Sequence, residues 1–246
     1  MEAGTVKWIL TRLALASVLL VLLVLLSGCG AEGTVAQIQS VHESVEQGNA
    51  TSATVLIDVA VGKVDLGDGS NRLMDATFQY TNPGLKPQVT YSPNNSEGSL
   101  SIVQAVDRNN LPSFGGAELY STDLRLSNQL PMSLNIRLGL DDANINLSNL
   151  QVEDFEMKLG AGRVTADLSG NYGRNVHARL TGGVGDFTLK VGDKMATRVT
   201  VTGNLGKVTA HRLVRDGDTY TNAANSANTL NVGIEGGTGN ITLEGP

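Results

Sequence analysis

A short repeated pattern constrains the fold of this chain more than any other feature of its sequence. The pattern is a glycine, a polar residue, an apolar residue, Thr or Asp, and a second apolar residue. Its first positions are Gly62, Gly162, Gly185, Gly206 and Gly239, and a sixth copy begins with Ala143 in place of glycine. The middle copies follow one another after 19, 23 and 21 residues. Periods near 20 residues are typical of solenoids, in which each repeat is one structural unit.

Alternating apolar and polar residues precede each repeated position, and this period of two indicates a half-buried strand. A glycine between two such strands permits a sharp corner at little steric cost. Each unit is therefore predicted to be a strand, a corner and a second strand. The alternating apolar sets are Val55/Ile57/Val59, Leu134/Ile136/Leu138, Phe155/Met157/Leu159, Val176/Ala178/Leu180, Val199/Val201 and Leu230/Val232/Ile234.

Two folds accommodate such units. Coils of about 20 residues can stack with their strands in parallel, as in a parallel β-helix, or the strands can form hairpins in an antiparallel β-sandwich. Tight hairpins favour Asn-Gly or Asp-Gly, which occur here only at Asp68-Gly69 and Asp216-Gly217, outside the repeated positions. The sequence therefore predicts an all-β chain that forms a β-solenoid, with the sandwich as the alternative.

Residues 73–116 depart from the repeat, although residues 76–80, 88–91 and 100–104 alternate as strands do. Solenoids require caps, because an open end exposes the unpaired edge of a sheet. We therefore expect one domain over residues 51–246. Its first part, 51–116, would be an irregular cap, and its second part, 117–246, would hold the regular repeats.

The N-terminal segment has the features of a secretory signal. Lys7 and Arg12 precede an apolar run at 13–26, which is shorter than the ~20 residues that a membrane-spanning helix needs. The following Leu26-Ser27-Gly28-Cys29 resembles a bacterial lipobox, in which the cysteine sulfur receives a diacylglyceryl group. We expect a signal peptide at 1–28, a lipidated tether at 29–50, and anchoring through Cys29 to the extracytoplasmic side of a bacterial cell membrane.

Composition excludes several classes of function. A net charge of −6 argues against nucleic-acid binding, which requires a basic face. A single cysteine excludes a disulfide framework and a cysteine-rich zinc site. His42, His177 and His211 have no carboxylate or cysteine at ligand spacing, so no metal site or cofactor is expected.

Catalytic patterns are likewise absent from the sequence. There is no Gly-x-Ser-x-Gly motif, and the segment from Gly182 has Phe187 where a calcium-binding repeat would need Asp. Adjacent carboxylates in a strand, such as Asp141 and Asp142, point to opposite faces and cannot bracket one bond. Arg137, Arg163, Arg174 and Arg179 have no acidic cluster at coil spacing beside them. The chain is therefore not expected to be an enzyme.

The order of these segments resembles the toastrack-type domain, in its N-terminal form, of LiaF-like proteins of the cell-wall-active antibiotics response family. The resemblance implies a solenoidal β-fold outside a bacterial membrane, sensing or scaffolding in envelope stress through protein contacts, and no catalytic residues. The segments that carry it begin at Val55, Ala76, Pro87, Leu100, Leu130, Leu147, Leu159, Gly182 and Tyr220.

Two hypotheses of function follow. The first is a membrane-anchored, non-catalytic module that binds an envelope protein, and the alternative is a β-helix protein that binds or processes wall or surface polysaccharide. An aromatic platform with an acidic pair would favour the alternative, whereas a smooth Thr/Asn face would favour the first. The outward polar positions of the repeat, read as a structural ladder rather than a recognition surface, are Lys63, Asn146, Thr165, Thr188, Thr209 and Thr242.

Overall fold

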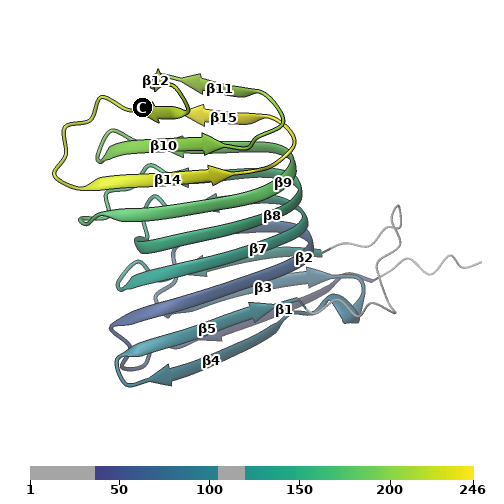
Figure 1. Ribbon diagram of the computed structural model, residues 1–246. Helices are drawn as coiled ribbons and strands as arrows, with labels where there is room; N and C mark the ends of the chain where they lie inside the picture. Colours follow the sequence, from purple (N-terminus) through teal and green to yellow (C-terminus); the bar gives the residue numbers. More distant parts are fainter. Residues whose placement is uncertain (1–36, 105–119) are drawn as a thin grey trace, which may run out of the picture. The chain divides into compact units, whose positions relative to one another are not determined.

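The predicted repeats fold into long strands that lie side by side in parallel. A computed structural model describes this arrangement for residues 37–104 and 120–246 (Figure 1). Four bent strands form the centre of the stack: β2 (Ser52–Asp68), β7 (Pro131–Asn146), β8 (Gln151–Leu168) and β9 (Val176–Val191). Each pairs in parallel with the next over both of its halves, with Leu134 beside Phe155 and Phe155 beside Ala178. The predicted β-solenoid is therefore confirmed.

Each long strand bends near its middle and runs back behind its own first half (Figure 1). We call the first halves of these strands, with the strands that pair with them, the first wall; the second halves and their partners form the second wall. Side chains that point between the walls form the core, in which Ile57 and Met157 of the first wall and Leu66 and Ala166 of the second are fully buried. The apolar positions of the period-two pattern are thus those that face inward.

The bends stack on one another through glycines. Gly162 lies beside Gly185 in the pairing of β8 with β9, and the φ angles of these two glycines are 142° and 134°. The corner predicted at Ala143 is wrong by two residues, because Ala143 pairs with the strand residue Val164, and Asp141 is the residue that lies beside Gly162. A shift of two residues keeps every side chain on its own face, so the alternating pattern does not reveal it.

Strands at the N-terminal end of the stack complete a mixed cap. The first half of β2 pairs with β5 and the second half with β6, so β5 and β6 together correspond to a further coil. Antiparallel strands lie outside them in both walls. The elements of this end are β1 (Gln39–Val45), β3 (Met74–Tyr80), the 3-10 helix η1 (Pro83–Leu85), β4 (Gln88–Asn94), β5 (Glu97–Val103) and β6 (Tyr120–Leu126).

Two details of this end differ from the sequence-based expectation. Residues 39–45, expected to be part of a tether, form β1, because Val41 and Val45 pack against the core while β1 pairs along its whole length with β3. Residues 52–68, expected to be part of an irregular cap, form the regular coil β2.

The last coils do not stack in the order in which they occur in the sequence. The later strand β14 lies between β9 and β10, and the later strand β15 lies between β9 and β11. An antiparallel pair, β12 and β13, extends the first wall beyond β10. The elements are β10 (Ala196–Thr202), β11 (Val208–His211), β12 (Val214–Asp216), β13 (Thr219–Thr221), β14 (Thr229–Glu235) and β15 (Ile241–Glu244). The final 18 residues are therefore inserted into the stack rather than added to its end.

Candidate interaction surface

The predicted threonine ladder exists on the outer face of the second wall. Thr165 lies beside Thr188, Thr188 beside Thr242, and Thr242 beside Thr209. The spatial order therefore differs from the sequence order, as it does for the coils themselves. The two other predicted positions are not in this ladder: Lys63 lies beside Asp142, and Asn146 beside Asp167.

The four arginines that the sequence singled out are paired within the fold. Their side chains contact carboxylates of other strands or turns, so the charges serve contacts between coils. Such exposed pairs contribute about 1 kcal/mol or less each. The pairs are Arg137 with Asp58 at 3.8 Å, Arg163 with Asp142 at 4.0 Å, Arg179 with Glu235 at 3.2 Å, and Arg174 with Glu153.

The three histidines lie on separate strands. His42 is on β1, where its Nδ1 lies 2.8 Å from Thr77 Oγ1, while His177 is on β9 and His211 ends β11. Within the described ranges, no three His, Cys, Asp or Glu side chains meet as a metal site would require. In the same part of the chain no helix is long and apolar enough to cross a membrane. Cys29 lies outside the described residues.

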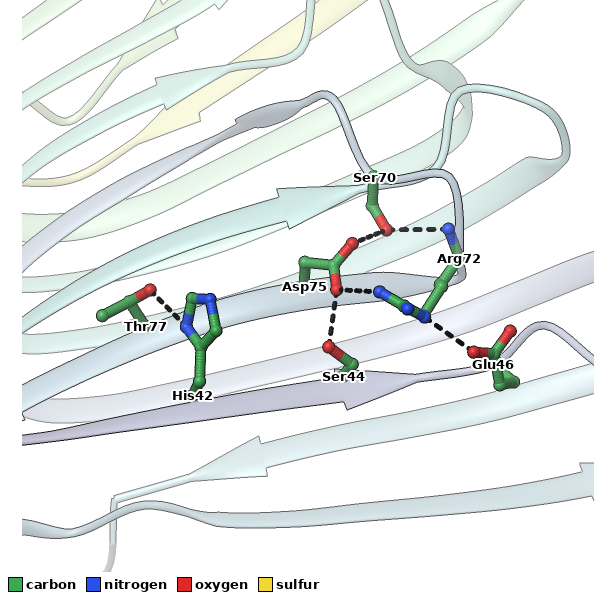
Figure 2. A network of polar contacts seen from close by, with 7 residues as sticks. All are labelled: His42, Ser44, Glu46, Ser70, Arg72, Asp75 and Thr77. Atoms are coloured by element: carbon green, nitrogen blue, oxygen red, sulfur yellow. Dashed lines mark hydrogen bonds and ion pairs between the residues drawn. The ribbon is translucent and has the colours of Figure 1, made fainter.

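A polar network fastens the edge strand β1 to the rest of the cap (Figure 2). The Asp75 carboxylate accepts hydrogen bonds from Ser44 Oγ at 2.6 Å and Ser70 Oγ at 2.7 Å. Arg72 reaches the same carboxylate at 2.9 Å and contacts Glu46 at 2.6 Å. The hydrogen bonds from the two serines, helped by Arg72, outweigh the opposing effect of burial and leave the pKa of Asp75 below its usual value. Because its polar groups satisfy one another, this network reads as a structural fastening of β1 rather than a binding site.

A hollow of about 850 Å³ opens on the outer face of the first wall. It lies over β2, β7, β8, β9, β14 and β10, where successive strands carry polar and charged side chains outward. Its volume is within the range of ligand-binding clefts. Its charged side chains are those of Asp154, Glu156, Arg179, Arg198 and Glu235, and Asn135, His177 and Asn231 add further polar groups.

Gly233, in the middle of β14, forms part of the floor of this hollow. A Cβ at Gly233 would meet no atom within 4 Å, and the φ angle of Gly233 is not in the left-handed region. Every other glycine of the described residues either has such a φ angle or has an atom closer than 3.4 Å to the Cβ position. Neither the backbone conformation nor the neighbouring atoms therefore require glycine at position 233. A glycine inside a strand costs roughly 0.5–1 kcal/mol relative to alanine, so the fold alone would favour a larger residue there.

The side chains around Gly233 come from three neighbouring strands. Arg179 of β9 lies directly beside Gly233 on one side, and Thr200 of β10 on the other. In the next row Asn231 is flanked by His177 and Arg198. This ring offers both hydrogen-bond donors and acceptors around an open centre, and its charges can orient a polar group.

Sequence reasoning did not identify this hollow. The strand pattern predicts that Arg179 and Asn231 face outward, but the neighbours of Gly233 depend on the exchanged order of the last coils. The available signal was a glycine inside a strand and away from every corner, which marks a close approach or an opening.

The fold and this surface define the class of protein, a β-solenoid whose coils turn on stacked glycines. The sequence matches the family described as the N-terminal domain of toast_rack, DUF2154, over residues 34–190, and the chain belongs to this family. The resemblance stated from the sequence is thereby confirmed.

One solved structure agrees with the fold over most of the chain. A candidate cell adhesion protein from Clostridium sporogenes ATCC 15579 is 24% identical, with a TM-score of 0.78, and the match covers 85% of this chain and 100% of that chain. A candidate adhesin from Bacteroides fragilis NCTC 9343 is 11% identical, with a TM-score of 0.32 and coverage of 84% and 97%. Among curated proteins, none matches the chain significantly.

Proposed function

We propose that this protein is a lipid-anchored, non-catalytic interaction module of the bacterial cell envelope, and that it binds a partner protein in the hollow over Gly233. The single observation that carries the proposal is that Gly233 is not required by the backbone or by its neighbours, yet keeps the centre of a polar face open. A role in sensing or scaffolding during envelope stress is the form of this function that we favour.

Two further points support a binding module. The membership in the toastrack family and the name of the similar Clostridium protein, a candidate cell adhesion protein, fit interaction outside the cell. Phe155 is the one Phe, Tyr or Trp among the residues that line the hollow, and its ring is buried and faces the core. The lining therefore presents no exposed aromatic ring on which a sugar could stack. A mixed polar face of this kind favours a protein partner over a glycan, because sugar rings commonly stack on aromatic side chains.

The anchor in this proposal is a lipid on Cys29. Ten residue steps separate Cys29 from Gln39, the first residue of β1. Ten extended residues reach at most about 35 Å, so an anchor on Cys29 would keep β1 within that distance of the lipid. Stable anchoring requires two acyl chains or a second membrane contact, because one chain binds only marginally.

The test uses the full chain produced in a bacterial host. A photoreactive amino acid is placed at Thr200, beside Gly233, and separately at Thr188, on the outer face of the second wall, as the matched control. We expect a protein adduct from position 200 only, and its loss in the Gly233→Leu variant, which fills the hollow. Equal adducts from both positions, or an adduct that survives Gly233→Leu, would contradict the proposed surface.

The anchor is tested separately by metabolic labelling with palmitate. We expect labelling of the wild-type chain and none of the Cys29→Ser variant. Labelling that is unchanged by Cys29→Ser would show that the lipid anchor is wrong, while leaving the adduct experiment as the test of the binding surface.

A further inference from the structure

Large apolar side chains are exposed on this protein mainly at the level of the bends. Among the residues whose side chains the structure describes, four large apolar side chains are more than half exposed, those of Ile38, Val184, Leu205 and Val214. Val184 and Leu205 each directly precede a corner glycine. Val214 lies in β12, which extends the first wall away from the bends.

Val184 and Leu205 occupy equivalent positions of their coils. Val184 forms a β-bridge with Thr238, and the glycines that follow Thr238 and Leu205 lie against each other in the same way. We call the positions directly before the corners the corner row, which follows the line of bends in Figure 1. Its members, in spatial order, are Val61, Ala161, Val184, Thr238 and Leu205.

The third exposed apolar side chain, Ile38, extends the corner row at its other end. Gln39 pairs with Tyr80, and Tyr80 pairs with Tyr120. Tyr120 lies against the corner at Gly62, where a Cβ would be 2.7 Å from the Tyr120 carbonyl oxygen. Ile38 directly precedes Gln39 and therefore lies at the level of the corner row. The start of β1, at which the N-terminal segment joins the fold, is thus on the same edge of the stack.

The backbone at the exposed end of the corner row is hydrogen-bonded between coils. The Thr238 N–H donates to the carbonyl oxygen of Gly183 at 2.8 Å, and the Leu205 N–H to that of Gly237 at 2.9 Å. In the apolar part of a bilayer an unpaired N–H group has no water to bond to. The amides of Thr238 and Leu205 are already paired, so this part of the row can meet an apolar surface without that penalty.

Charges beside the corner row balance one another. Within two residues of the row and of the equivalent position in β7 are three cations, Lys63, Arg163 and Lys207, and three acidic residues, Asp141, Asp142 and Asp186. Asp142 lies beside Lys63 and 4.0 Å from Arg163, and Asp186 accepts a hydrogen bond from Asn240 at 3.0 Å. This edge is therefore neutral in a chain whose net charge is −6, and contact with lipid would depend on its apolar side chains.

From these observations we infer that the corner row is a membrane contact, in which Val184 and Leu205 enter the lipid surface while the lipid on Cys29 holds the other end. The inference rests on the proposed function, because it requires that anchor. Nine residue steps separate Cys29 from Ile38, and nine extended residues reach at most about 32 Å. The tether therefore brings this edge, rather than either wall, to the lipid. One acyl chain binds only marginally, and the corner row supplies a second contact.

The contact fixes how the stack lies on the membrane. In the second wall eight strand spacings separate β1 from β11, which is about 38 Å. Ile38 and Leu205 lie at these two ends, so a contact at both would place the stacking direction along the membrane plane. Arg179, in the hollow, precedes Val184 by five strand residues, or about 16 Å. The hollow would then open sideways, close to the lipid surface.

The experiment uses the full chain produced in a bacterial host that is grown with ³²P-labelled phosphate. A photoreactive amino acid replaces Thr238, between Val184 and Leu205, and separately Thr188, as the matched control. Adducts with phospholipid carry the label and lose it on treatment with phospholipase C, whereas the diacylglyceryl group on Cys29 contains no phosphate. Thr188 lies four strand residues behind Val184, about 13 Å, which is beyond the ~5–10 Å that interfacial elements reach. We expect light-dependent labelling from position 238 only.

Variants test whether the apolar side chains cause the contact. Val184→Ser combined with Leu205→Ser should lower the labelling from position 238 about fivefold or more. Val214→Ser removes the exposed apolar side chain that lies off the row and should leave the labelling unchanged. All three side chains are exposed, and the resistance of each variant to protease shows whether the fold is retained.

Several results would overturn the inference. They are the absence of phospholipid label at position 238, equal labelling from position 188, labelling that the double variant leaves unchanged, and an adduct at position 238 with a protein or a second copy of the chain in place of lipid. Palmitate on Cys29 with a protein adduct at position 200, but no phospholipid adduct at position 238, would remove the inference and leave the proposed function. A phospholipid adduct at position 238 without a protein adduct at position 200 would remove the proposed binding surface and leave the membrane contact.

Discussion

The carbonyl oxygen of Gly185 lies so close to Gly239 in the neighbouring coil that a Cβ on Gly239 would be 1.9 Å from it. The same contact recurs one coil further, where a Cβ on Gly206 would lie 1.9 Å from the carbonyl oxygen of Gly239. Gly239 also has a φ angle of 142°, which side chains rarely adopt. Position 239 is therefore limited to glycine both by its own conformation and by the backbone of the neighbouring coil.

Replacement of Gly239 by alanine is expected to destabilise the domain by about 3 kcal/mol or more, because it adds backbone strain to a clash with a neighbouring carbonyl group. Urea unfolding of the full chain measures the change. Gly233→Ala is the matched control, since both glycines belong to the last inserted coil. We expect Gly233→Ala to stabilise the domain by about 0.5–1 kcal/mol. Similar losses in both variants would contradict the distinction between corner and floor glycines.

Gln104, directly after the end of β5, supplies from its side chain the hydrogen-bond acceptor that a paired strand would otherwise provide to the backbone of β2. Its buried side-chain Oε1 accepts hydrogen bonds from the backbone N–H groups of Ala60 and Val61, both at 2.9 Å. In Gln104→Met, a side chain of similar length without an acceptor leaves both donors unpaired. We expect a loss of about 2–4 kcal/mol in the free energy of unfolding, measured by urea denaturation. A loss below about 0.5 kcal/mol would show that water or another group replaces the amide oxygen.

The general fold could be predicted from the sequence because local rules determine it. Alternation at period two separates inward Val55 from outward Thr54, and glycine at 162 and 185 marks the corners. The register at Ala143 could not be predicted in this way, since a shift of two residues preserves alternation and only the neighbour Val164 fixes it.

The order of the last coils and the hollow required the three-dimensional neighbours. Val199 of β10 and Val232 of β14 occupy equivalent positions in equivalent patterns, so nothing local decides which of them lies beside Ala178 of β9. In the structure it is Val232. The exchange brings Gly233 between Arg179 and Thr200, whereas stacking in sequence order with the same register would have placed Thr200 directly beside Arg179.

Asp75 is expected to make the cap sensitive to acid. Hydrogen bonds from Ser44 and Ser70 lower the pKa of Asp75 in the folded state, so its stabilising contribution is present above the unfolded pKa of about 3.9 and is lost as the pH falls through the lower folded value. Asp75→Asn removes this contribution. Urea unfolding should therefore show a difference between wild type and Asp75→Asn at pH 7 that shrinks below about pH 4.

The exposed carboxylate of Asp193, between β9 and β10, gives a matched control for Asp75. Asp193→Asn should leave the free energy of unfolding within about 0.5 kcal/mol of wild type at neutral pH. If Asp75→Asn and Asp193→Asn behave alike at pH 7 and in acid, the network in Figure 2 does not hold β1 in place.

Tyr172 is expected to make the domain sensitive to alkali. The side chain is buried, and its hydroxyl group donates to the carbonyl oxygen of Leu147 at 3.4 Å. Burial, and secondarily the charge of Asp167, raise the pKa of Tyr172 well above its usual value of about 10. The unfolded chain therefore loses the phenolic proton first, so the contribution of the neutral side chain is complete below pH 10 and is lost as the pH rises towards the folded pKa. Within that window the loss is about 1.4 kcal/mol per pH unit.

Tyr172→Phe removes the ionisable group while keeping the ring. Near pH 8 we expect a loss of about 1 kcal/mol or less, from the weak hydrogen bond to Leu147. Above pH 10 the stability of the wild type should fall more steeply with pH than that of Tyr172→Phe, so the two curves of free energy against pH converge or cross. Other alkaline titrations occur in both proteins and cancel in the difference. Parallel curves between pH 8 and pH 11 would show that the Tyr172 hydroxyl is reached by water in the folded state, contrary to its buried position between the walls.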